Sequence, residues 1–291
     1  LFSSVFYIIN SDLRLKKLTL LFFTFLILNA HYTKAHFEEK YRYNYNSILF
    51  VKNLMNSIQI KYTDTFIEIR SNGVPDHAIG KFPRKGNPNI ISEQSHNLKI
   101  TKFPKKQSQI TSSRFFGIAI NGIMFVPGTA GCWGGNRRSL NTCQWKEEAI
   151  VNGKLKLGLD NNHGHVQRTG MYHYHGLPKG LIDRLKVNSS KKDLIKVGFA
   201  GDGFGIFISK SNKYKPSYKL RKRNRPNGPL GKFDGTYTND FKFVPKSGDL
   251  DECNGLNIEQ GYIYLITNSF PYIPRCWVGK PHISFLTRPD N

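Results

Sequence analysis

The chain has 291 residues, with 43 lysine and arginine residues against 20 aspartate and glutamate residues, so its formal net charge is +23. A hydrophobic content of 39% and an aromatic content of 13% are enough to build a core, which excludes wholesale disorder. Collagen-like, coiled-coil and polytopic membrane classes are also excluded, because there is no glycine period, no heptad run and a single long apolar stretch.

Residues 1–35 are predicted to be a signal peptide with a possible upstream leader. The basic segment 13–17 (LRLKK) precedes eleven apolar residues at 18–28, and the small residues Ala30 and Ala35 follow. Eleven helical residues rise only ~16 Å, short of a bilayer core of ~30 Å, so a cleaved signal is favoured over an uncleaved anchor. We therefore predict export, as a secreted, periplasmic or cell-surface protein.

Export permits disulfide bonds. Four cysteines follow the predicted signal: Cys132, Cys143, Cys253 and Cys276. They allow three connectivities, of which we favour the local pairs Cys132–Cys143 and Cys253–Cys276, since each closes a short loop. The absence of any CxxC motif argues against a zinc ribbon and a thioredoxin-like redox site.

The remaining sequence predicts three further parts. Residues 36–59 are polar without a clean period and are read as an irregular N-terminal segment, and residues 60–281 as a β domain followed by a tail at 282–291. Short β-branched and aromatic runs alternate with turn residues through 60–281, for example at 65–70 (TFIEIR). We predict a mainly β fold: one large antiparallel, sandwich-like domain with long loops and disulfides.

Turn dipeptides and the lack of helical periodicity support this fold. Asn121-Gly122 and Asp202-Gly203 each interrupt an apolar run and are predicted to form type I′ hairpin turns. No long stretch has the 3.6-residue period of an amphipathic helix, which favours a mainly β domain.

Four histidines are concentrated within thirteen residues, in the segment 163–175 (HGHVQRTGMYHYH). Directly opposed residues of a hairpin have a constant sum of residue numbers, and the pairs His163/His175 and His165/His173 both sum to 338. This register leaves a three-residue loop whose third residue, Gly170, occupies the left-handed position of such a turn. The turn and the histidine symmetry therefore predict the same hairpin.

The predicted hairpin places the four imidazoles on one face, because alternate residues of a strand share a face. Opposed Cβ atoms lie ~5 Å apart, so several rings can reach one ion. The other face carries Val166 opposite Tyr172 and Gly164 opposite Tyr174, and it is predicted to face the core. Truncating Tyr174 should therefore destabilise the fold.

Imidazole ligands are suited to several transition metals, and copper or zinc is the predicted cofactor. We predict a metal site made by His163, His165, His173 and His175, of which only two or three need to be ligands. Proton competition should then weaken metal binding as the pH falls through ~6.5. A solvated or hydrogen-bonded histidine face without metal is the alternative.

Three further residues are candidate partners of this site: His77, Asp160 and Asp202. Each has a structural alternative, since His77 is in a loop that favours a surface position and both aspartates are in turn sequences.

The densest basic run is Lys213 to Arg225 (KYKPSYKLRKRNR), with seven positive residues and no acid. It predicts contact with an anionic polysaccharide or a membrane surface, although a solvated loop is the simpler alternative. A nucleic-acid partner is not predicted because of the signal peptide, and no feature specifies an oligomeric state.

The run GMYHYHG at 170–176 resembles the signature of the YHYH domain family, exported proteins named after that tetrapeptide. Further blocks are similar to the family: SNGVPDH at 71–77, NGIMFVPGTA at 121–130, LGLDNNHGH at 157–165 and NSFPYIPRCW at 268–277. The run GDGFGIF at 201–207 departs from the family pattern DGxPIYG. The resemblance implies export, a domain over about residues 60–280 and an important Tyr-His-Tyr-His strand, but no reaction.

Three functions remain open from the sequence. The first is an exported metal-binding protein; the second is a metal-dependent cell-surface enzyme, a hydrolase or oxidase; the third is an adhesive or polysaccharide-binding β module. An open metal position in a cleft, with a carboxylate placed as general base, would distinguish the enzyme.

Overall fold

The structure is a computed structural model that describes residues 54–134, 143–187 and 192–286. The predicted signal at 1–35, most of the segment 36–59 and the tail beyond 286 lie outside the described residues. Among the residues described, no helix has the length and apolar character needed to cross a membrane.

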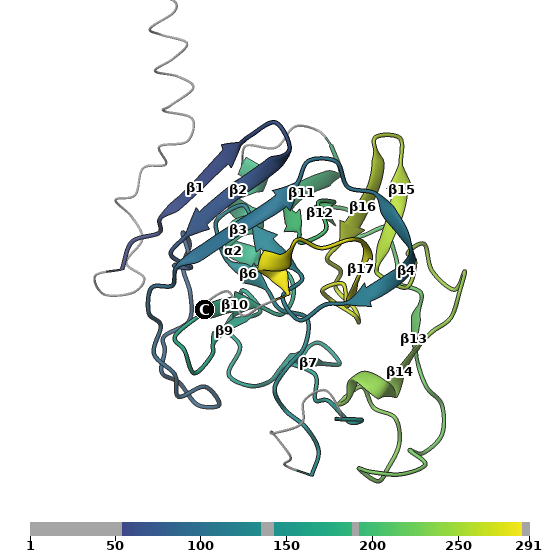
Figure 1. Cartoon of the computed structure of the whole chain (residues 1–291). Helices are drawn as coiled ribbons and strands as arrows, with labels where there is room; N and C mark the ends of the chain where they lie inside the picture. The colour runs from purple at the N-terminus through teal and green to yellow at the C-terminus, as the bar shows by residue number, and fades with distance from the viewer. Residues whose placement is uncertain (1–53, 135–142, 188–191, 287–291) are drawn as a thin grey trace, which may run out of the picture. The chain divides into compact units, whose positions relative to one another are not determined.

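The mainly β prediction is confirmed. The largest sheet has eight strands in the order β15-β16-β12-β11-β5-β6-β10-β9 (Figure 1). In chain order these strands are β5 (Gly117–Ala119), β6 (Met124–Phe125), β9 (Gly164–Val166), β10 (Tyr172–Tyr174), β11 (Leu194–Ala200), β12 (Gly205–Ser209), β15 (Gly255–Ile258) and β16 (Gly261–Leu265).

A three-stranded antiparallel sheet is formed by β1 (Ile58–Tyr62), β2 (Phe66–Ser71) and β3 (His96–Thr101). Alternate residues of β2 and β3, including Ile69 and Ile100, belong to the same buried cluster as Phe116 and Tyr174 of the large sheet region. The two sheets therefore share one core, which fits the predicted sandwich-like arrangement.

The remaining strands form three two-stranded ribbons. They are β17 with β4 (Cys276–Gly279 and Lys106–Ser112), β13 with β14 (Tyr218–Leu220 and Phe241–Phe243) and β7 with β8 (Ile150–Val151 and Lys154–Leu155). Short 3₁₀ helices occur at η3 (Thr238–Asp240) and η4 (Ile283–Phe285), and Phe285 is buried.

Two features differ from the sequence predictions. The large sheet is mixed rather than purely antiparallel, because β10 runs parallel to β6 and β12 runs parallel to β16. A nine-residue helix, α2 (Lys179–Val187), follows Pro178 and buries Leu181 and Ile182. It was not predicted from the sequence because two and a half turns are too short to show a clear period.

The hairpin turns are a further correction, since the predicted type I′ turns are three-residue loops. Gly122 and Gly203 each have a positive φ and occupy the third loop position, and Gly170 has the same place in the histidine hairpin. A type I turn followed by a left-handed residue produces this loop.

Both predicted disulfides are present, Cys132–Cys143 and Cys253–Cys276. The second joins the segment just before β15 to the first residue of β17, and both of its cysteines are buried. Each closes a short loop, so on the chain-entropy account each stabilises the fold by about 3 kcal/mol.

Candidate metal centre

The histidine hairpin has the predicted register. Strand β9 pairs antiparallel with β10 so that His165 lies opposite His173, Val166 opposite Tyr172 and Gly164 opposite Tyr174. Strand β10 is also hydrogen-bonded to β6, so it is an inner strand of the large sheet. This position explains why His173 and His175 are buried while His165, on the edge strand, is only partly buried.

Three of the four histidines converge, and we call His165, His173 and His175 the histidine trio. Their ligand atoms all lie within 4.8 Å of one another. The Nε2 atom of His175 is 3.0 Å from Nε2 of His173 and 3.2 Å from Nε2 of His165. A tetrahedral ion with Zn–N bonds of ~2.05 Å would separate its ligand nitrogens by ~3.3 Å, so the trio has nearly the spacing that an ion requires.

Backbone carbonyls orient two rings of the trio, His165 and His173. The Nδ1 atom of His165 lies 2.8 Å from the Leu157 carbonyl, and Nδ1 of His173 lies 3.2 Å from the Met171 carbonyl. Donation of these N–H groups leaves the lone pair of each Nε2 atom pointing toward the centre. The Nε2 atom of His175 carries at most one proton and can donate it to only one of the other two Nε2 atoms. At least one close nitrogen–nitrogen contact is therefore left without a hydrogen bond, and a bound cation would relieve it.

Burial keeps the trio neutral. It lowers the pKa of His173 to about 3, helped by the neighbouring charge of His165 and opposed by the Met171 carbonyl. The pKa of His175 is well below its ordinary value, chiefly through burial and then through His173 and His165. Burial also lowers the pKa of His165. Neutral imidazoles are the metal-binding form, and proton competition moves to lower pH than the ~6.5 expected from the sequence.

The fourth histidine of the hairpin, His163, does not join the trio. Its φ of +53° interrupts the extended conformation just before β9. Its ring lies against Gly176, where Ile150 also packs. Burial and the charge of Lys179 lower its pKa to about 4. The structure therefore places His163 beside the hairpin rather than at its centre.

Asp160 organises the turn that leads into β9. Its Oδ1 accepts hydrogen bonds from the amides of Asn162 and Gly164 at 2.8 and 3.2 Å. Its Oδ2 accepts from the Gly80 amide at 2.9 Å and from the Tyr172 hydroxyl at 2.8 Å. With both oxygens used in this way, Asp160 supports the hairpin instead of contributing a ligand.

The other two candidates also have structural partners. His77 is buried, not at the surface, and its Nε2 lies 2.5 Å from the Tyr174 hydroxyl on the opposite face of the hairpin. Asp202 accepts hydrogen bonds from the Tyr264 hydroxyl at 2.6 Å and from the Gly279 amide at 2.9 Å. Neither is part of the histidine trio.

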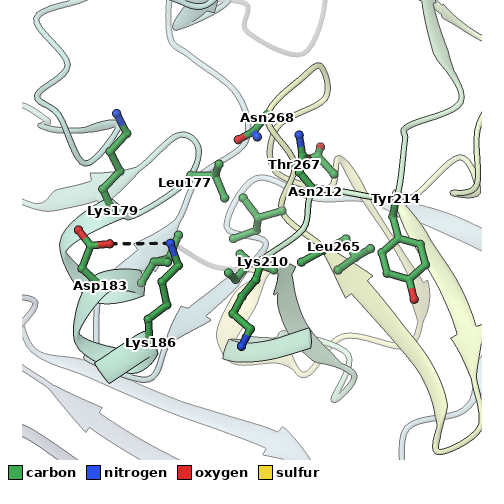
Figure 2. A pocket seen from close by; sticks show the side chains of 14 residues that line it. Leu177, Lys179, Asp183, Lys186, Lys210, Asn212, Tyr214, Leu265, Thr267 and Asn268 are labelled. Carbon is green, nitrogen blue, oxygen red and sulfur yellow. Dashed lines mark ion pairs between the residues drawn. The ribbon is translucent and has the colours of Figure 1, made fainter. Parts of the chain in front are cut away.

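Two cavities lie elsewhere on the domain. One, of about 290 Å³, lies between α2 and the ends of β12 and β16, where Lys186 pairs with Asp183 at 4.0 Å (Figure 2). The other, of about 580 Å³, is lined by Glu147, Asp234 and Leu157 among others. No candidate histidine lines either cavity.

Sequence reasoning missed the supporting groups of this centre. The carbonyls that orient His165 and His173 belong to Leu157 and Met171, and a backbone carbonyl leaves no signature in a sequence. Asn121 connects the Tyr174 hydroxyl, at 2.9 Å, to Asp76, at 2.8 Å, and Asp76 is ion-paired with Arg184 of α2. These contacts join segments far apart in the chain.

The Tyr174 hydroxyl is expected to stabilise the fold without affecting the trio. Tyr174→Phe removes the hydrogen bonds that two buried partners, His77 and Asn121, form with its hydroxyl, so the free energy of unfolding should fall by about 1–3 kcal/mol. Zinc affinity should stay within a few-fold, since the ring remains in the core. Urea unfolding and zinc titration measure the two effects, and an equal loss of zinc affinity would contradict this separation.

Comparison with known proteins agrees with the hairpin signature. Residues 97–279 match the profile of the family described as YHYH protein. No curated protein and no solved structure matches the chain. The matched segment covers more than half of the chain and contains the whole histidine hairpin. The chain therefore belongs to the YHYH protein family.

Proposed function

We propose that this is an exported protein that binds one transition metal ion, copper or zinc, through the Nε2 atoms of His165, His173 and His175. The observation that supports it most is the convergence of three neutral imidazole nitrogens, with separations of 3.0 and 3.2 Å, at one point. Three protein ligands leave a coordination position open, and imidazole nitrogen suits both metals.

Export is supported by the two disulfide bonds together with the signal-like leader, since disulfides persist in oxidising compartments. Metal holding is favoured over hydrolysis for two reasons. No carboxylate belongs to the metal-binding group among the residues described, and the nearest acid on the hairpin, Asp160, has both oxygens engaged. A hydrolase would need a base near the ion.

Calorimetric titration of Zn²⁺ and Cu²⁺ into the full chain, prepared without a histidine tag, tests the proposal. One ion should bind per chain. His173→Ala should weaken binding on the order of 100-fold or more, because loss of a mere supporting group already costs ~10–100-fold at metal sites.

Two further variants make the test specific. His282→Asn preserves the capping acceptor of η4 and should leave affinity unchanged. His163→Ala should change affinity only a few-fold, since this ring is outside the trio. Equal losses at His163 and His173 would establish a four-histidine site instead. If the wild type binds neither ion more tightly than His173→Ala, the metal proposal is wrong.

A further inference from the structure

The ribbon of β13 and β14 has two unlike faces. Its register places Tyr218 opposite Phe243, Leu220 opposite Phe241 and Lys219 opposite Lys242. The rings of Tyr218 and Phe241 pack on Phe270, with centroids 5.2 and 3.9 Å away. Because side chains alternate along a strand, Lys219 and Lys242 project from the other face, where both are exposed.

Two lysines directly opposite each other are an unfavourable pair unless an anion lies between them. Neither forms an ion pair with a described residue. The ribbon, at the lower right of Figure 1, leads directly into Arg221, Lys222 and Arg223, which are all exposed. The outer face of the ribbon is thus followed directly in the chain by a second group of exposed cations.

Arg225 holds the loop that carries these cations. Only 4% of its side chain is exposed, and it pairs with Asp240 and Asp234, at 2.6 Å each. Its Nη1 also donates to the Leu230 carbonyl at 3.2 Å. Six of the seven positive residues in the run 213–225 are therefore exposed, the seventh is structural, and the acids packed against it are already paired.

An exposed aliphatic side chain lies at the closing end of this loop. Leu230 is 87% exposed, between Pro229 and Gly231, and the bridge between Asn224 and Lys232 joins the two arms of the loop behind it. An exposed apolar side chain on a loop that is fixed from behind and follows a run of exposed cations matches the boundary between lipid headgroups and acyl chains.

We infer that this surface, formed by Lys219, Arg221, Lys222, Arg223, Leu230 and Lys242, binds an anionic phospholipid membrane. The cations meet the headgroup phosphates, and Leu230 enters the layer beneath them. An acidic polysaccharide would satisfy the cations but not Leu230. Sugars also stack on exposed aromatic rings, whereas the ribbon's Tyr218 and Phe241 pack inward on Phe270.

Vesicle binding by the full chain tests this inference, with phosphatidylcholine vesicles compared with vesicles that also contain phosphatidylglycerol. The neutral vesicles measure whatever the apolar segment 18–28 contributes. Combining Arg221→Gln, Lys222→Gln and Arg223→Gln should weaken binding to the anionic vesicles on the order of 100-fold, since each surface cation contributes ~5-fold. Leu230→Ser should also weaken it, with all charges retained.

A matched triple variant provides the control. Lys61→Gln, Lys81→Gln and Lys85→Gln remove the same charge from exposed positions outside the loop, and binding should change only a few-fold. Equal losses in both triple variants would overturn the inference in favour of general charge attraction. Unchanged binding in Leu230→Ser, or retention by an acidic polysaccharide without vesicle binding, would overturn it in favour of a polysaccharide. Melting temperatures confirm that each variant is folded.

Discussion

The metal-free protein is expected to lose stability steeply as the pH falls from about 6.5 toward 4. Six buried or half-buried histidines have a lowered pKa: His77, His163, His165, His173, His175 and His282. In the unfolded chain these imidazoles titrate near ~6.5. Below that pH the unfolded chain takes up protons that the native protein does not, so the free energy of unfolding decreases.

The pH range of this loss of stability follows from the individual pKa values. The contribution of His173 is complete above ~6.5 and is lost progressively down to about 3, and that of His163 down to about 4. At pH 5, His173 alone lowers the free energy of unfolding by about 2 kcal/mol, since each pH unit below 6.5 costs about 1.4 kcal/mol. The other histidines act in the same direction. Asp202 acts in the opposite direction, because burial raises its pKa.

Chemical unfolding of the chelator-treated protein at several pH values measures this dependence. Between pH 6 and 4, His173→Gln should reduce the slope of the free energy of unfolding against pH by the amount that corresponds to the uptake of about one proton. Bound zinc should keep the wild type stable to lower pH, because the ion occupies the neutral imidazoles. A wild-type slope identical to that of His173→Gln would show that the ring already takes up a proton in the folded protein.

The histidine hairpin could be predicted from the sequence because its information is local. Gly170 specifies the loop and the spacing of the histidines specifies the opposed pairs, so the sum of 338 recurs in the structure. The two disulfides are similarly short-range. In contrast, β10 pairs in parallel with β6, and β12 pairs in parallel with β16. The paired segments are far apart in the sequence, so no local sequence pattern predicts these pairings.

Which of the candidate residues belong to the site depends on backbone conformation that the sequence does not reveal. Strict alternation would put His163 on the same face as His165, but its left-handed φ ends the alternation one residue before β9. The role of Asp160 was open between a turn and a ligand, and its four hydrogen bonds come partly from Gly80, about eighty residues earlier.

The aromatic ring that packs over Gly164 is another feature that the sequence alone did not specify. The predicted arrangement set Gly164 opposite Tyr174, and the register confirms this pairing. The ring that covers Gly164, however, is that of the diagonal neighbour, Tyr172, whose hydroxyl reaches Asp160. Tyr174 instead extends toward His77 and Asn121. Diagonal contacts are within reach of aromatic side chains, so opposition alone does not decide which ring covers a glycine.

Gly164→Ala is therefore expected to disturb the metal centre without altering any ligand. A Cβ atom at this position would overlap the hydroxyl and ring carbons of Tyr172. Tyr172 is fully buried and hydrogen-bonded to Asp160, so the clash must be relieved by moving β9 away from β10. The free energy of unfolding should fall by about 1–3 kcal/mol, as in other overpacked cores.

The same displacement carries His165 on β9 away from His173 and His175 on the β10 side, so zinc affinity should fall by ~10–100-fold, the effect of losing a supporting contact. Gly128→Ala is the matched control, because a Cβ atom there meets no atom within 4 Å and the backbone φ is not positive. It should change neither stability nor zinc affinity appreciably. If Gly164→Ala loses stability but binds zinc like the control, the trio does not depend on the spacing of β9 and β10. The ion would then have to be held mainly by His173 and His175. These two residues lie on one continuous segment, so the distance between their rings does not depend on how β9 pairs with β10.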